Sequence, residues 1–107
     1  METFQLQWDN FQENLATSFK ALREESELYD VTLACDDDQI EAHKVILSAS
    51  SSFFKRIIKR NPHAHPLLYL KGVKIDILIS MLDFMYLGKT SVAQSQVERI
   101  GERIGQE

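Results

Sequence analysis

The side chains best suited to nucleophilic chemistry are the single cysteine, Cys35, and the serines Ser48, Ser50, Ser51 and Ser52. A serine nucleophile usually sits on a sharp turn such as G-x-S-x-G, and the sequence contains neither this motif nor a glycine-rich phosphate loop. Clustered serines are ordinarily helix caps and turn residues, and a cysteine within an apolar strand pattern is ordinarily a buried, inert thiol. We therefore expect no catalytic residue and no enzymatic activity.

Metal-binding residue types are present, but their spacing is poor for a metal site. His63 and His65 are two positions apart, whereas His43 lies far from both along the chain. A zinc site requires three or four converging ligands, and no cysteine pair could complete one. The acidic run at residues 36–38 lacks the glycine and the ligand spacing of an EF-hand loop, so we interpret it as a solvated hairpin turn. We expect no metal and no other cofactor.

Basic side chains gather on one predicted helix, where Lys55, Arg56, Lys59 and Arg60 share a face. The 107-residue chain nevertheless has a net charge of −4. Because no helix-turn-helix or zinc-finger pattern accompanies this face, we interpret it as a solvated face or a contact for a partner protein. We expect no direct nucleic-acid binding by this domain. Nor do we expect a membrane partner, since no apolar run reaches the ~18–20 residues of a membrane span.

The composition indicates one globular domain. Hydrophobic residues make up 44% of the chain and charged residues 26%, with four glycines and two prolines. A chain of this length supports one core, and a single cysteine suits a reducing compartment. The N-terminus lacks a basic segment followed by an apolar one, so we predict no signal peptide.

The first predicted element is a strand at residues 4–8, in which Phe4, Leu6 and Trp8 alternate with polar residues. A five-residue strand at a chain end cannot stand alone, so it needs a sheet edge elsewhere. Asn10, or Asp9, is placed to cap the following helix, with Glu13 three residues after Asn10 in the capping-box position.

The predicted helix at residues 10–23 carries a narrow apolar stripe, which something must cover. The stripe consists of Phe11, Leu15, Phe19 and Leu22. From the residues alone, it packs either on the core of its own protomer or on a partner protomer.

Residues 30–54 predict a strand, an acidic turn, a second strand and two helices. Alternating apolar residues mark the first strand, and residues 39–41 return as the second. The apolar period becomes helical from Ala42 to Ser50, and Ser51 is placed to cap a further helix. This helix ends near Asn61, because the residue before a proline avoids helical conformation.

The chain after Asn61 predicts two strands, a central helix and a weak C-terminal helix. Residues 67–70 predict a strand buried on both sides, and residues 75–87 predict a central, buried helix that ends at Gly88. A short strand is expected at residues 90–92. The tail at residues 94–107 predicts a weak helix, since each of its two glycines costs ~1 kcal/mol relative to alanine.

The motif D-V-T-L followed by A-H-K-V-I-L-S-A-S-S-x-F-F, within residues 30–54, resembles the signature of BTB/POZ domains. Residues 4–10, F-Q-L-Q-W-D-N, resemble the extra N-terminal segment of the Tramtrack group of arthropod BTB domains. The motifs H-P-L-L-Y-L-K and L-D-F-M-Y-x-G fit the same group, and the resemblance extends over roughly residues 4–93. Serines at residues 50–52 replace the usual Cys-Ser-Pro, and Gly72 replaces an aspartate, which concerns local turns.

The resemblance implies an α/β BTB/POZ fold, a helical cluster flanked by a short three-stranded sheet, with the N-terminal strand and helix exchanged between protomers. Residues 1–107 would form one domain with its core at residues 30–93. Asp30 and Lys44 would form a charged pocket at the dimer interface. The interface itself would be made by Phe11, Leu15, Phe19 and Leu22.

The function implied by the resemblance is homo-oligomerisation within a nuclear transcription or chromatin regulator, whose DNA-binding module, such as a zinc finger, is separate. The N-terminal strand with Phe4, Leu6 and Trp8 would join dimers into hexamers, because an open strand edge templates another strand. Other BTB proteins or co-regulators are further expected partners. The alternative is a substrate adaptor for a cullin-type ubiquitin ligase, which in some BTB families uses the surface around the helix at residues 52–60.

Overall fold

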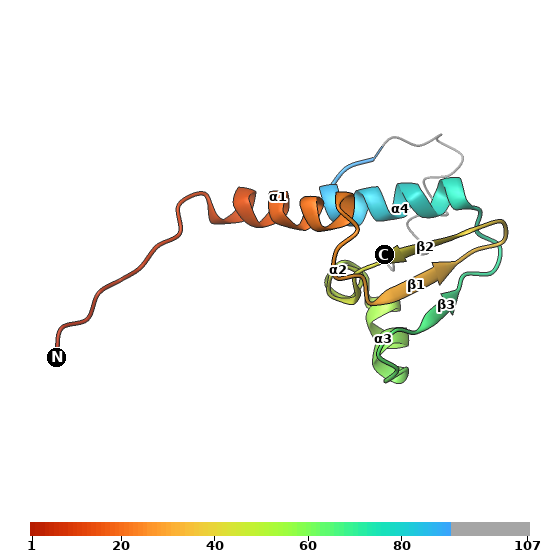
Figure 1. The fold of residues 1–107 in the computed structure, drawn as a ribbon, viewed down its shortest axis with the longest axis horizontal. Coiled ribbons are helices and arrows are strands. Elements are labelled where there is room, and N and C mark those ends of the chain that lie inside the picture. Colours follow the sequence, from red (N-terminus) through yellow and green to blue (C-terminus); the bar gives the residue numbers. More distant parts are fainter. Residues whose placement is uncertain (91–107) are drawn as a thin grey trace.

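The computed structural model describes residues 1–90, which form helices and strands in the order α-β-β-α-α-β-α (Figure 1). The elements are α1 (Phe11–Glu24), β1 (Val31–Ala34), β2 (Gln39–Ala42), α2 (Lys44–Ser50), α3 (Ser52–Arg60), β3 (Leu67–Tyr69) and α4 (Ile75–Leu87). The predicted α/β architecture, a helical cluster with a three-stranded sheet, is confirmed.

The sheet has the strand order β2-β1-β3. β1 and β2 form an antiparallel hairpin in which Leu33 pairs with Ile40. β1 and β3 run parallel, with Leu33 opposite Leu68. Parallel strands need a long crossover connection, and α2 and α3 provide it. The sheet therefore brings the segments before and after these helices together.

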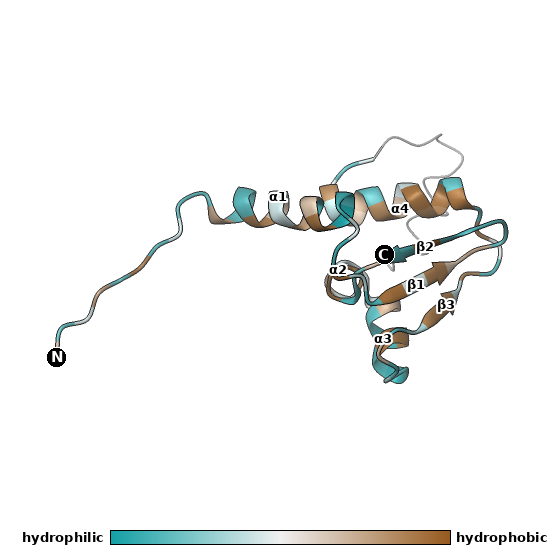
Figure 2. Cartoon of the chain, in the orientation of Figure 1, coloured by the Kyte–Doolittle hydropathy of each residue, from teal (hydrophilic) through white to brown (hydrophobic). Residues whose placement is uncertain are grey.

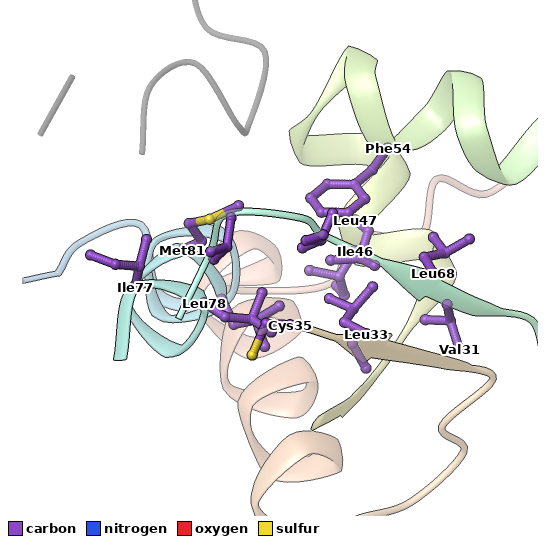
Figure 3. Close-up of a cluster of buried hydrophobic side chains, with 14 of the residues drawn as sticks. Val31, Leu33, Cys35, Ile46, Leu47, Phe54, Leu68, Ile77, Leu78 and Met81 are labelled. Carbon is purple, nitrogen blue, oxygen red and sulfur yellow. The ribbon is translucent and has the colours of Figure 1, made fainter. Parts of the chain in front are cut away.

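The core lies between the inner face of the sheet and the helices (Figure 3). Leu33 of β1, Leu47 of α2 and Leu78 of α4 are fully buried, and Phe54 of α3 joins them. The helix α4 supplies five buried residues, but Ile79 is 41% exposed. The prediction that α4 is buried over most of its circumference is therefore wrong for one side of the helix.

The strand β3 also differs from its prediction. Leu68 and Leu70 are buried, whereas Leu67 and Tyr69 are 58% and 59% exposed. β3 is an edge strand with one face on the core, so its side chains alternate between the core and the outer face of the sheet. The apolar run L-L-Y-L predicted burial on both sides, and this expectation is wrong.

The acidic turn at residues 36–38 is exposed, but its carboxylates are hydrogen-bonded within the protein. Asp36 Oδ1 accepts from the Tyr69 hydroxyl at 2.9 Å and from the backbone N–H of Gly72 at 3.1 Å. Asp37 Oδ1 accepts from the backbone N–H of Ile75 at 2.8 Å, which caps the first turn of α4. The turn therefore ties the hairpin to the segment that leads into α4, and it is more than the solvated turn that the sequence predicted.

Helix ends follow the sequence prediction at two places and depart from it at a third. Ser51 Oγ accepts from the backbone N–H of Phe54 at 3.2 Å, and Gly88 ends α4 with a φ of 77°, as predicted. Asn10 does not cap α1 with its side chain. Its φ is 54°, and the amide of Asn14 instead donates to the carbonyl of Asp9 at 3.0 Å.

Residues 1–8 extend away from the sheet and form no strand in the single chain (Figure 1). The strand expected at residues 4–8 requires a sheet edge from another chain, so it stays a prediction. The strand expected at residues 90–92 and the tail at residues 94–107 lie at or beyond the end of the described residues. Among residues 1–90, no helix is long and apolar enough to cross a membrane.

Candidate interaction surface at helix α1

The helix α1 projects from the domain, and its N-terminal half lies beyond the sheet and the other helices (Figure 1). No residue of α1 is buried. Phe11 is 48% exposed, Leu15 and Leu22 are half-buried, and Phe19 packs partly against the core. The predicted apolar stripe is therefore real, but the protomer covers only part of it.

The segment before α1 adds further apolar residues, which alternate with hydrophilic ones (Figure 2). Phe4 is 79% exposed, Leu6 94% and Trp8 55%. The rings of Trp8 and Phe11 make an edge-to-face contact with their centroids 5.0 Å apart. Contiguous exposed apolar residues on a folded protein mark an interaction surface more often than isolated ones do.

The C-terminal end of α1 is anchored to α4 through Arg23. Its Nη1 lies 2.9 Å from Asp83 Oδ1, and its guanidinium lies over the Tyr86 ring at 4.8 Å from the centroid. The Tyr29 hydroxyl donates to the carbonyl of Arg23 at 2.8 Å. These contacts fix the end of the helix and the direction in which it leaves the core.

A buried histidine continues this anchor. The Nε2 of His43 lies 2.7 Å from the carbonyl of Glu27, and a carbonyl can only accept, so Nε2 carries the proton. Nδ1 then accepts from the Tyr86 hydroxyl, which itself accepts from the backbone N–H of His43 at 3.0 Å. Burial raises the pKa of Tyr86 to about 12, so this hydroxyl stays protonated. The cluster joins the loop after α1 to α4.

From the sequence, His43 was a candidate only as a metal ligand, and this cluster was not predicted. The signal was weak, because its members are Arg23, Glu27, His43, Asp83 and Tyr86, which are far apart along the chain. A histidine at the junction of a predicted strand and a predicted helix was the one available indication, since a ring that is buried there needs hydrogen-bond partners.

The residues of the predicted charged pocket lie together, but their side chains have other partners. Asp30 Oδ1 accepts from the backbone N–H of Lys44 at 2.7 Å, at the first residue of α2. The ammonium of Lys44 donates to the carbonyls of His63 and Ala64 at 2.9 and 3.2 Å. In the single chain Asp30 therefore acts as a helix cap, and a charged pocket at a dimer interface stays a prediction.

The remaining candidates for chemistry have structural partners. The Cys35 thiol is buried and lies 3.2 Å from the carbonyl of Asp38. His65 Nε2 lies 2.9 Å from Thr32 Oγ1 and 3.8 Å from a carboxylate oxygen of Glu41. In the described part of the chain, no three histidine, cysteine or acidic residues are grouped as a metal site would require. The surface at α1 is suited to binding a protein.

Comparison with known proteins gives consistent matches. The model of the BTB/POZ domain family matches residues 19–102. The Longitudinals lacking protein-like of Drosophila melanogaster is 45% identical over 90% of this chain and 76% of its own length. Protein tramtrack, alpha isoform, from the same organism is 40% identical over 90% of this chain, which spans 12% of that relative.

The fold matches solved structures as well. The BTB domain of zebrafish PATZ1 aligns with a TM-score of 0.78, covering 95% of this chain and 86% of that one. At 18% sequence identity this likeness concerns the fold.

Proposed function

The chain belongs to the BTB/POZ family, a family of protein-interaction domains, and from this membership we propose that its function is homo-oligomerisation through an exchanged α1. In the proposed dimer, the α1 of each protomer packs on its partner. The residues of this interface are Phe11, Leu15, Phe19 and Leu22.

The observation that carries the proposal is the uncovered stripe of α1. Fully burying an apolar side chain of this size contributes roughly 1.5–3 kcal/mol, and several of these side chains are already half-buried. Covering the stripes of two protomers would therefore contribute on the order of 10 kcal/mol. This is comparable with the ~4–15 kcal/mol cost of association, so covering the stripe would offset much of that cost.

The N-terminal segment is proposed to join dimers into higher assemblies such as hexamers. Phe4, Leu6 and Trp8 are exposed and have the alternation of a strand, whose open N–H and C=O groups can pair with another edge. Deleting residues 1–8 removes this segment and leaves α1 and the core intact, so the deletion tests the two contacts separately.

The wider role is proposed from the relatives. The chain spans 76% of one Drosophila relative and about a tenth of tramtrack, so a domain of this kind is a small part of some relatives. We propose a nuclear transcription or chromatin regulator in which another module binds DNA. Joining several such modules raises their effective concentration on DNA without new contacts to it. Other BTB proteins and co-regulators are proposed as further partners.

The test is light scattering after size exclusion over a range of concentrations at ~150 mM salt. Leu15→Asp places a charge in the stripe and should abolish the dimer. Thr17→Asp is the matched control, because Thr17 is exposed and lies on the opposite side of the helix. A Leu15→Asp protein with the mass of the wild type would contradict the proposal.

The cullin-adaptor alternative stays a prediction from the sequence. A pull-down with a cullin N-terminal domain separates it from the proposed function. Retention of the chain on the cullin would favour the adaptor, whereas binding to a second copy of the chain favours oligomerisation.

A further inference from the structure

Charges are segregated along the chain. No aspartate or glutamate occurs between Ala42 and Ile75, while residues 24–41 are rich in both. The middle segment instead carries the basic residues Lys44, Lys55, Arg56, Lys59, Arg60, Lys71 and Lys74. The net charge of −4 therefore hides two segments of opposite charge.

The basic surface is concentrated at α3. Its four cationic side chains and Ser52 line a shallow groove of about 310 Å³. All four cations are exposed, and none of their side chains has a hydrogen bond or ion pair within residues 1–90. The long stems of lysine and arginine provide apolar walls, and the charged ends form the rim. The groove thus suits an acidic segment that carries an apolar side chain. We call this site the α3 groove, and its four cationic residues are Lys55, Arg56, Lys59 and Arg60.

The loop that follows α1 has these properties. Glu25 and Glu27 are exposed, and Leu28 between them and the sheet is 77% exposed. The side chain of Glu25 is hydrogen-bonded to that of Glu27 and repelled by its charge, which raises the pKa of Glu25. Bringing a cation to this pair would relieve the repulsion.

The loop is also held in one conformation. The backbone N–H of Glu27 donates to the carbonyl of Leu22 at 2.9 Å, and the carbonyl of Glu27 faces Nε2 of His43 at 2.7 Å. Ser26 and Leu28 have positive φ values of 54° and 60°. A loop fixed in this way loses little conformational freedom on binding.

We propose that the α3 groove of one copy binds the acidic loop at residues 24–28 of a second copy, which makes a contact between dimers. The proposal rests on the proposed self-association, and its contact is separate from α1 and from residues 1–8. Each copy carries one loop and one groove, so the contact is heterologous and can close a ring or extend a chain of dimers.

Local complementarity decides this contact, even though two copies of net charge −4 repel at long range. Exposed charges are screened beyond about 8–10 Å at physiological salt, whereas the loop carboxylates and groove cations would lie within contact distance. The contact should therefore weaken as salt is raised, unlike the apolar α1 interface.

The experiment is sedimentation velocity of the whole chain at about 50 and 150 mM salt, with circular dichroism as the check of folding. The groove variant is Arg56→Glu with Arg60→Glu, and the loop variant is Glu25→Lys with Glu27→Lys. Each should weaken association between dimers about tenfold while leaving the dimer intact. The four substitutions together restore complementarity and the original net charge, so they should restore the assembly.

The matched control is Lys74→Glu with Lys89→Glu, at exposed positions outside the α3 groove. Like the groove variant, it lowers the net charge by four, from −4 to −8. The control should retain the assembly. A groove variant that assembles like the control overturns the proposal, and so does a fourfold variant that is not restored.

Two further outcomes separate this contact from the proposed function. A wild-type chain that stays a dimer at every concentration overturns the groove contact but leaves α1-mediated dimerisation standing. A folded wild-type monomer overturns both.

Discussion

Replacing Tyr86 with phenylalanine should destabilise the domain strongly, although it removes a single oxygen atom. The Tyr86 hydroxyl serves both the backbone N–H and the ring Nδ1 of His43. Both residues are buried, with 6% and 5% of their surface exposed. In the described part of the chain, every buried side-chain nitrogen and oxygen has a partner. The substitution would leave two polar groups of His43 without one.

The expected loss follows from these two groups. A buried donor or acceptor left without a partner costs about 1–3 kcal/mol, so two such groups should lower the free energy of unfolding by about 2–6 kcal/mol. For a domain of this size, each kcal/mol corresponds to a shift of about 4–8 °C in Tm. The expected decrease in Tm is therefore at least about 8 °C.

The assay is urea unfolding at a fixed protomer concentration, because self-association makes stability concentration-dependent. Tyr69→Phe is the matched control, since it also removes a hydroxyl bonded to another side chain, but at an exposed site. The control should cost less than about 1 kcal/mol, because water replaces the lost partner. Equal losses for the two variants would refute the importance that we assign to the buried cluster.

Three further predictions concern the anchor, the acidic turn and the end of α4. Arg23→Met removes the bridge to Asp83 and should cost about 1 kcal/mol, with faster amide hydrogen exchange in α1. Hydrogen bonds, first from the Tyr69 hydroxyl, lower the pKa of Asp36 in the folded protein. Ionised Asp36 therefore contributes stability that is fully present above the ordinary pKa of about 3.9 and is lost as the pH falls through the lowered pKa. Asp36→Asn should remove this part of the acid dependence of the urea midpoint. Gly88→Ala should cost about 1 kcal/mol in urea unfolding because of its φ of 77°, and Gly88→Asn less.

Several elements could be predicted because their signals are local. The helix at residues 75–87 was predicted at the bounds that the structure gives, since an apolar period and a C-terminal glycine define it. The hairpin at residues 31–42 followed from alternation on either side of an acidic turn. The cap at Ser51 likewise depends on neighbours within three residues.

The errors concern information that lies elsewhere in the chain. Whether Leu67 and Tyr69 are buried depends on whether another element covers the outer face of the sheet, which the residues of β3 do not specify. The carboxylates of Asp36 and Asp37 find donors more than thirty residues later. The apolar stripe of α1, which carries the proposed interface residues, was evident from the spacing of those residues. Which protomer covers the stripe depends on the direction of α1.

The direction of α1 is set at the C-terminal end of the helix. Arg23 is held on α4, and α1 runs without interruption from Phe11, so Phe11 lies about 18 Å along the axis from the anchor at 1.5 Å per residue. A helix fixed at its last turn cannot fold its first turns back on the same core without breaking. The exposed stripe is therefore a consequence of the contacts of Arg23, His43 and Tyr86. A second protomer could cover the stripe without breaking the helix.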